Sequence, residues 1–524
     1  MDYLKFHKWN EKDKNTLSKS SRENLGMKEI QFYQPYFSLY FHIHNTKNSH
    51  KKIDLERRYI IKKILNTSNE KYHTSNLFVN CQVLDKYSNA LTIKKLFCKC
   101  VPLLDPLYFM MNNYNNFVHR NPLLPSGFSN NTYQKINDMS NTAYIDTFFS
   151  YISSELTLNN INPSFPTFYG SFNGIKSSFN YDISDEYDDY KEECWFHKNL
   201  GKTYTIDMYL SDSDNGSDNS DNGSDNSDNG SDNSDNDSDN GSDNGSDNSD
   251  NGSDNSDNDS DNESDNDSDN DSDNSSNYSS NDDYIASLKD IPSQLFFIEL
   301  LEGTLEDLLE DFNDLDTKII LSCMFQISFA LCYLQKKFNF THNDLHVNNI
   351  MFKKTEKAYL YYKFNNIYFK VPTHGYLFKI IDFGRAIFTF HKKLFFNDTF
   401  EKHGEASGQY SVPYSKLLFS NNKEKILPNF NFDLCRLATT ILDVCDFNKN
   451  KNYHENQNFV DFIYNLTLKN NGESLYDLDD DFDLYISIAK EATNSSPLKI
   501  IQHNIFNQYR IKKKNFPKKS FYTL

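Results

Sequence analysis

Two short stretches of the sequence combine acidic and amide side chains at spacings that suit phosphate chemistry. The first, FTHNDLHVNNIMF at residues 340–352, places Asp344 five residues before Asn349, in a loop that leads into an apolar run. The second, FKIIDFGRAIF, places Asp382 between two isoleucines and a Phe-Gly turn. Phosphoryl transfer needs a carboxylate that accepts a proton from the attacking hydroxyl, and oxygen ligands for magnesium on the nucleotide phosphates. We therefore predict Asp344 as the catalytic base and Asn349 and Asp382 as Mg²⁺ ligands, although either stretch alone is a weak signal.

The elements around these stretches must bring them together. From Leu77 the chain reads as short strand-like runs, and after residue 300 it reads as apolar helices, with the Asp344 loop following the central one. This order predicts an α+β, bilobal fold with a strand-rich first lobe and a helical second lobe. The predicted parts are an N-terminal segment of unknown structure (1–75), a strand-rich lobe (76–300) interrupted by a disordered insert (211–283), a helical lobe (301–510) and a basic tail (511–524).

The motifs together resemble the protein-kinase signature, H-R-D-L-x-x-x-N followed by D-F-G. HNDLHVNN matches at His342, Asp344, Leu345 and Asn349, and IDFG matches in full. Upstream, FFIELLEGTLEDLL resembles the hinge between kinase lobes and the helix that follows it. Downstream, NFDLCRL resembles the start of the helix that supports the catalytic loop, with Asp433 capping the loop backbone. Four matches in the right order make the resemblance to a kinase-like fold specific.

Among kinases, the chain looks closest to haspin-like kinases, including those of large DNA viruses. The shared features are His346 directly after Asp344-Leu345, and a long stretch between Asn349 and Asp382 whose alternating aromatic residues suggest an added β-hairpin. This resemblance implies an ATP- and Mg²⁺-dependent serine/threonine protein kinase that binds ATP and a protein substrate. It also implies that Glu299 and the backbone of Leu301 face the adenine, and that His342 is a buried structural residue.

A strand lysine should pair with the nucleotide phosphates, and LTIKKLFCKCVPLLDP offers two candidates. Lys99 fits best because LFCKC alternates like a buried strand and the run then reaches a proline, but Lys94 is a rival. For the acidic partner of this lysine, Glu155 lies on a helical stretch before SFPTFYGSF, which resembles the fourth kinase strand. A solvated surface role remains an open alternative for each of these residues.

The sequence departs from the kinase pattern in three places. It has no G-x-G-x-x-G motif and no glycine between Gly26 and Gly127, so the usual backbone cradle for phosphates is degenerate or absent. Asn343 replaces the arginine that would pair with a phosphorylated activation loop, and no A-P-E follows Asp382. A small-molecule phosphotransferase, which also reads H-x-D-x-x-x-x-N, and a catalytically inactive kinase-like scaffold therefore stay open as alternatives.

The charge of the chain is concentrated in one segment. The formal net charge is −20, with 74 acidic and 54 basic residues. Residues 211–283 carry 25 of the carboxylates and no Lys or Arg, so the rest has 74 − 25 = 49 acidic residues and a balance of 54 − 49 = +5. Such a Ser/Asp/Asn-rich tract cannot offset the entropy of ordering, which predicts disorder. The balance of the remainder gives no indication of nucleic-acid binding.

Compartment signals favour an intracellular protein, cytoplasmic or nuclear, or one in the host cell or virion if the chain is viral. The eight cysteines include no C-x-x-C pair and mostly lie in apolar runs, which is typical of a reducing compartment. The first residues, MDYLKFHKWNEKDKN, contain no apolar signal-peptide core. The longest apolar run, 319–334, is shorter than a bilayer span and carries Ser and Gln, so we interpret it as a buried helix rather than a membrane segment.

Overall fold

The computed structural model describes most of the chain outside the acidic insert. By contacts the chain divides into one unit formed by Met1–Tyr209 with Asp283–Leu524, and a second unit, Leu210–Asp282. The insert predicted for 211–283 lies outside the described residues, except for Asp283. The described residues are 6–32, 53–68, 75–116, 133–138, 140–209, 283–310, 317–401, 404–410, 428–445, 457–476 and 481–524.

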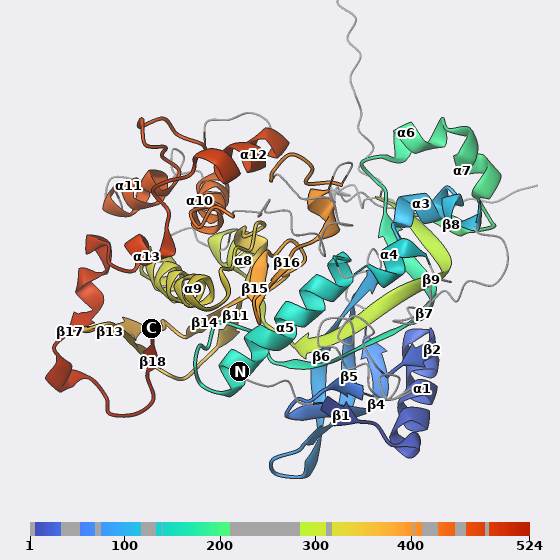
Figure 1. The fold of residues 1–524 in the computed structure, drawn as a ribbon, viewed down its shortest axis with the longest axis horizontal. Helices are drawn as coiled ribbons and strands as arrows, with labels where there is room; N and C mark the ends of the chain where they lie inside the picture. Colours follow the sequence, from blue (N-terminus) through green and yellow to red (C-terminus); the bar gives the residue numbers. More distant parts are fainter. Residues whose placement is uncertain are drawn as a thin grey trace, which may run out of the picture. The chain divides into compact units, whose positions relative to one another are not determined.

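A large antiparallel sheet dominates the first part of the chain (Figure 1). Strand β5 alternates between buried and half-buried residues, with Leu77, Val79, Cys81 and Val83 facing inward. This period of two is what a strand with one face on a core requires. In sheet order the strands are β2 (Met27–Gln31), β7 (Phe168–Asp182), β9 (Asp283–Glu299), β6 (Ala90–Pro102), β5 (Leu77–Asp85) and β4 (Tyr59–Ser68), with β8 (Tyr204–Tyr209) paired to β9.

The sheet begins earlier in the chain than the sequence predicts. β2 and β4 both belong to the segment 1–75 that we set apart, yet β2 pairs with β7 and β4 pairs with β5. Helix α1 (Glu11–Leu25) contacts β4, begins at the Asn10 cap and ends at Gly26, whose φ of 60° suits glycine. The smaller elements of this part are β1 (Phe6–Lys8), β3 (Ile53–Leu55), α3 (Pro106–Met110), α4 (Gln134–Asn137), α6 (Tyr187–Lys191) and α7 (Cys194–Asn199).

Strands β8 and β9 close the acidic insert at its base. They are antiparallel, and the register pairs Tyr209 with Asp283, the two described residues that flank the insert. The pairing then continues without a shift to Tyr204 and Leu288. The chain therefore leaves and re-enters the sheet at neighbouring positions.

Two helices form the centre of the molecule. Helix α5 (Thr142–Leu158) packs against β7, and almost all of its residues are buried. Helix α9 (Thr317–Phe338) is the helix that we predicted from its apolar run. By length and composition α9 could cross a membrane, but 78% of its most apolar window is buried inside the protein, as in the core helix of a folded domain. The interpretation of this run as a buried helix agrees with that burial.

The rest of the second part is helical with small sheets. The long stretch between Asn349 and Asp382 forms an antiparallel hairpin of β12 (Tyr359–Phe364) and β13 (Ile367–Pro372), which confirms the predicted hairpin. The mixture of a curled sheet and helices is compatible with the predicted α+β class. The other elements are β10 (Gly303–Thr304), β11 (Ile350–Lys354), β14 (Tyr376–Ile380), β15 (Phe388–Phe390), β16 (Lys393–Phe395), β17 (Arg510–Ile511), β18 (Tyr522–Thr523), α8 (Leu305–Glu310), α10 (Phe432–Cys445), α11 (Gln457–Leu466), α12 (Asp481–Glu491) and α13 (Pro497–Ile500).

Candidate active site

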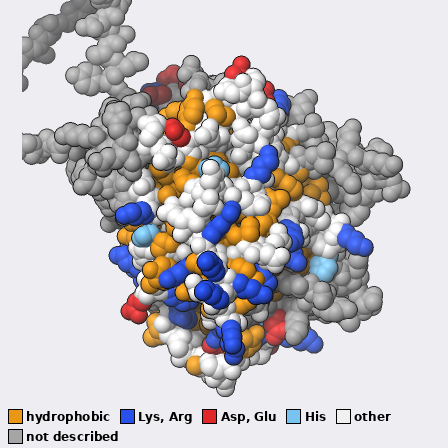
Figure 2. Space-filling model, turned by 90° about the vertical axis from the view of Figure 1, so that its left-hand side faces the viewer, with side chains coloured by type: hydrophobic (Ala, Val, Ile, Leu, Met, Phe, Trp, Pro, Cys, Tyr) orange, Lys and Arg blue, Asp and Glu red, His pale blue; other side chains and the backbone are white. Residues whose placement is uncertain are grey.

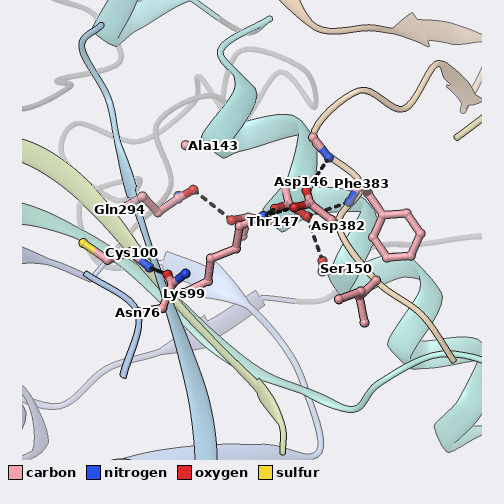
Figure 3. Close-up of polar contacts among 12 residues, drawn as sticks. Asn76, Lys99, Cys100, Ala143, Asp146, Thr147, Ser150, Gln294, Asp382 and Phe383 are labelled. Atoms are coloured by element: carbon pink, nitrogen blue, oxygen red, sulfur yellow. Dashed lines mark hydrogen bonds and ion pairs between the residues drawn. The ribbon is translucent and has the colours of Figure 1, made fainter. Parts of the chain in front are cut away.

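A lysine and two aspartates from distant parts of the chain meet beside the large sheet. The Nζ atom of Lys99 on β6 lies 2.7 Å from Asp146 Oδ2 on α5 and 2.8 Å from Asp382 Oδ2, just after β14. Figure 3 shows the lysine reaching from its strand toward both carboxylates. Asp146 also accepts a hydrogen bond from the backbone N–H of Phe383 at 3.0 Å. Asp146 therefore ties the strand lysine to the turn that carries Asp382.

The charges in this cluster stabilise one another. Burial alone would lower the pKa of Lys99, but Asp146 and Asp382 raise it above its ordinary value, so the ammonium stays charged. Burial raises the pKa of Asp146, although Lys99 opposes this. Burial would also raise the pKa of Asp382, but the attraction of Lys99 lowers it overall. Asp382 is therefore ionised at neutral pH and 38% of its side chain is exposed, which leaves it accessible to a cation.

Strand parity explains why Lys99 and not Lys94 reaches the cluster. On β6, Leu96, Cys98 and Cys100 are buried on one face, so Lys99 projects from the opposite face. Lys94 is two residues before Leu96 and therefore projects from the same face as Leu96, away from the cluster. Its Nζ atom lies 5.5 Å from the centroid of the Tyr59 ring instead.

Glu155, the predicted acidic partner, lies away from Lys99. It is on α5, as expected, but nine residues after Asp146, which is two and a half helical turns and therefore the opposite face of the helix. Its side chain accepts a hydrogen bond from Asn159 and lines a separate cavity with Tyr333 and Lys337. The structure replaces Glu155 by Asp146 as the partner of the strand lysine. The sequence signal for Asp146 is a lone acidic residue in the apolar run YIDTFF.

The loop that carries Asp344 is fixed by α10 and by the Asp382 turn. Both oxygens of Asp433, at the start of α10, lie 3.0 Å from the backbone nitrogen of His342, and Oδ1 also accepts from the backbone N–H of Asn343 at 3.0 Å. This confirms the predicted capping role of Asp433. His342 is fully buried, and its Nε2 lies 2.8 Å from the carbonyl oxygen of Ile381. The Asp344 loop and the Asp382 turn are thus joined through buried contacts.

Asp344 and Asn349 have different side-chain partners: Asp344 contacts residues outside the loop, and Asn349 contacts residues within it. One Asp344 oxygen, Oδ1, accepts a hydrogen bond from the Tyr485 hydroxyl at 2.9 Å and lies 3.8 Å from Nη1 of Arg385. The amide nitrogen of Asn349 donates to the carbonyl of Asp344 at 2.8 Å and lies 2.9 Å from Nε2 of His346. Burial lowers the pKa of His346, which favours the neutral ring that accepts this bond. The side-chain oxygen Oδ1 of Asn349 takes no part in these contacts, whereas its backbone carbonyl accepts a hydrogen bond from the Ile381 N–H at 3.1 Å.

The donor set suits magnesium better than a metal that prefers nitrogen or sulfur. Asp382 and Asn349 offer only carboxylate and amide oxygens, the hard ligands that Mg²⁺ binds. Within the described residues no group of three His, Cys, Asp or Glu could enclose a metal ion. Mg²⁺ in nucleotide sites usually takes one or two protein ligands and completes its shell with phosphates and water. The pair therefore fits the group, and these two residues would hold it.

A cavity of about 200 Å³ adjoins the ion cluster. Glu299 and Leu301 are not among its lining residues, and Ile298 is the last lining residue of β9. The Glu299 carboxylate instead pairs with Lys353 and Lys379, which outweigh the effect of burial and lower its pKa. The lining residues are Asn76, Phe97, Lys99, Ser150, Ser153, Pro166, Phe296, Ile298, Ile381, Asp382 and Phe383.

The connection from β4 to β5 borders this cavity through Asn76, whose Oδ1 accepts a hydrogen bond from the backbone of Cys100. Residues 69–74 of this connection lie outside the described part of the chain.

Comparison with known proteins gives two distant similarities. No protein-family model matches the chain. A segment of 85 residues is 39% identical to the uncharacterized protein 098R of Invertebrate iridescent virus 6, covering 16% of this chain and 14% of that protein. A segment of 181 residues is 26% identical to the serine/threonine-protein kinase haspin homolog of Drosophila melanogaster, covering 33% of this chain and 31% of that protein. The chain thus matches less than a third of the length of either relative.

Proposed function

We propose that the chain is a magnesium-dependent phosphotransferase of the protein-kinase type, which transfers the γ-phosphate of ATP to a serine or threonine hydroxyl. The observation that carries this proposal is the contact of Lys99 with Asp382, next to a loop in which the Asp344 and Asn349 side chains are held by partly buried hydrogen bonds. The distant similarity to the haspin homolog points the same way. In this proposal the large sheet with α5 and the helices around α9 are the two kinase lobes, and the cavity lies between them.

Each residue then has a defined task. The apolar cavity walls, among them Phe97, Ile298 and Phe383, receive the adenine, whereas the Glu299 side chain is already paired with Lys379. Lys99 binds the nucleotide phosphates, with Asp146 orienting its ammonium. Asp382 and Asn349 hold Mg²⁺, which would neutralise charge on the transferring phosphoryl group. The hydroxyl oxygen of the substrate bonds to the γ-phosphorus as ADP departs, and Asp344 accepts the proton that this hydroxyl loses.

The test is magnesium-dependent ATP turnover by the purified full-length chain, with and without a generic protein substrate. We expect ADP formation that requires Mg²⁺, rises with protein substrate and labels serine or threonine. Turnover stimulated only by small hydroxyl compounds would instead favour the small-molecule phosphotransferase. Nucleotide binding without turnover under any of these conditions would favour the scaffold.

Tyr485 is a positioning residue for the catalytic base under this proposal. Its hydroxyl holds Oδ1 of Asp344 and leaves Oδ2 for a substrate. Its ring lies near the guanidinium groups of Arg436 and Arg385, at 4.8 and 5.7 Å from the ring centroid. Burial and the nearby Asp344 raise the pKa of the Tyr485 phenol, so it remains a donor across the physiological pH range.

Tyr485→Phe should therefore lower kcat by roughly tenfold, the scale of one hydrogen bond to a charged group, with an unchanged KM for ATP. The readouts are kcat and the KM for each substrate. Tyr464→Phe, on α11 and half-exposed, is the matched control and should change neither. A rise in kcat for Tyr485→Phe would contradict the positioning role and show instead that the phenol blocks the acceptor position.

A further inference from the structure

Two sequence features without a role in the active site, the added hairpin and the basic tail, form a single sheet. Strand order is β17-β13-β12-β18, so the hairpin lies between two strands from the end of the sequence. The register pairs Phe369 with Arg510 on one side and Tyr362 with Tyr522 on the other. The sequence predicts a boundary at residue 511, with the tail as a separate segment. The structure instead makes the tail part of the hairpin sheet.

The two faces of this sheet differ in character. Side chains such as Tyr362 and Phe369 are fully buried and pack against the ring of Phe325 of α9 in edge-on and tilted contacts. On the opposite face, Phe516 of the tail contacts the rings of Tyr361 and Tyr368. These contacts place Phe516, between Lys512–Lys514 and Lys518–Lys519 in the sequence, on the outer face of the hairpin.

The outer face carries an excess of positive charge. Residues 496–524 contain seven Lys or Arg and no Asp or Glu, and the outer side chains of the hairpin add Lys363 and Lys370. Figure 2 shows Lys and Arg side chains gathered on this side of the molecule with few acidic ones. We name the group the basic face: Lys363, Lys370, Lys512, Lys513, Lys514, Lys518 and Lys519. Within the described part of the chain, none of these seven lysines forms an ion pair with a carboxylate.

The composition of the basic face indicates the class of partner. Cations this close together repel one another, and a polyanion that neutralises them gains further free energy by releasing its own counterions. All seven are lysines, which act as point charges and can contact successive phosphates without the fixed geometry of a bidentate arginine pair. Lysine and tyrosine are both side chains that contact the phosphates and sugars of nucleic acid, and the exposed Tyr359 lies beside Lys370, whose Nζ is 3.7 Å from the centroid of its ring.

We propose that the basic face binds the phosphate backbone of nucleic acid without sequence preference. The whole-chain charge gives no hint of this, because the −20 net charge comes from the acidic insert, whereas these cations are local. None of the seven lysines lines the candidate active-site cavity. The inference therefore stands independently of the proposed phosphotransferase activity.

The test measures binding of the full-length chain to a fluorescently labelled 30-base-pair duplex of arbitrary sequence over a range of salt concentrations. The affinity should fall steeply with salt, because each phosphate contact contributes about −0.9 to the slope of the logarithm of the binding constant against the logarithm of the salt concentration. Replacing Lys512, Lys513 and Lys514 together by Gln should weaken binding at least tenfold and reduce the size of this slope by about two to three. All three lysines are exposed, and unchanged thermal unfolding would show that the fold is kept.

The control replaces three other exposed lysines, Lys12, Lys198 and Lys202, by Gln, which changes the net charge equally. It should bind the duplex like the unmodified chain. Equal losses in both triple variants, or no duplex binding at low salt, would overturn the proposal. Displacement of the duplex by polyglutamate at equal charge concentration would also overturn it, because the face would then bind acidic polypeptide.

Discussion

Asp344→Asn should leave the affinity for ATP with Mg²⁺ nearly unchanged, while phosphate transfer falls by roughly two to four orders of magnitude, the scale of a general base. The amide keeps the shape of the side chain and can still contact Tyr485 and Arg385, which hold Oδ1 in the structure. What it loses is the ability to accept a proton from the substrate hydroxyl. Nucleotide affinity by calorimetry and transfer by radiolabel, both at fixed magnesium, would separate the two effects.

Asp461→Asn on α11 provides the matched control, since it makes the same chemical change on an exposed helix surface. It should alter neither binding nor transfer. Undiminished transfer in Asp344→Asn would remove the base from the mechanism and, with it, the kinase interpretation of FTHNDLHVNNIMF.

Asp382→Ala should have a different signature, because this carboxylate is predicted to act in binding as well as in transfer. Loss of the metal ligand should weaken nucleotide binding in the presence of Mg²⁺ to the level seen with EDTA. Transfer should fall by roughly three orders of magnitude or more, since metal charge stabilisation amounts to several kcal/mol. The fold should persist, because Asp146 retains its contacts with Lys99 and with the Phe383 backbone.

The measurement is nucleotide affinity with and without Mg²⁺ for the unmodified chain and for Asp382→Ala. If the variant kept its magnesium-dependent gain in affinity, Asp382 would not be a metal ligand. A large drop in thermal stability would show instead that the ion cluster supports the fold.

Local patterns predict part of this arrangement. The period of two in LFCKC indicates that Lys99 faces away from the buried cysteines, and the structure brings it to Asp382. The aromatic alternation between Asn349 and Asp382 predicts a hairpin that is present. Four ordered motifs place Asp433 under the Asp344 loop, where its carboxylate accepts backbone N–H groups. A local pattern suffices for Lys99 and for the hairpin, whereas the prediction for Asp433 rests on the resemblance of the four motifs.

Partners that meet only in three dimensions could not be predicted in the same way. The helix that carries Asp146 was recognised, but a difference of nine residues turns Glu155 to the opposite side, and only the packing of α5 against β7 fixes which side faces Lys99. The sequence of the basic tail likewise gives no indication that it belongs to a sheet. Its pairing with β12 and β13 spans more than a hundred residues and leaves no periodic signal.

The pairing of Tyr209 with Asp283 has a consequence for how this protein tolerates change in its length. Because the two flanking strands meet in a fixed register, repeats can be gained or lost in the Ser/Asp/Asn tract while every strand of the sheet keeps its neighbours. Each doubling of a flexible loop costs only about 0.6 kcal/mol of closure entropy, which is small against the stability of a folded domain. The pairing of β8 with β9 therefore allows the number of repeats between them to change with little effect on folding.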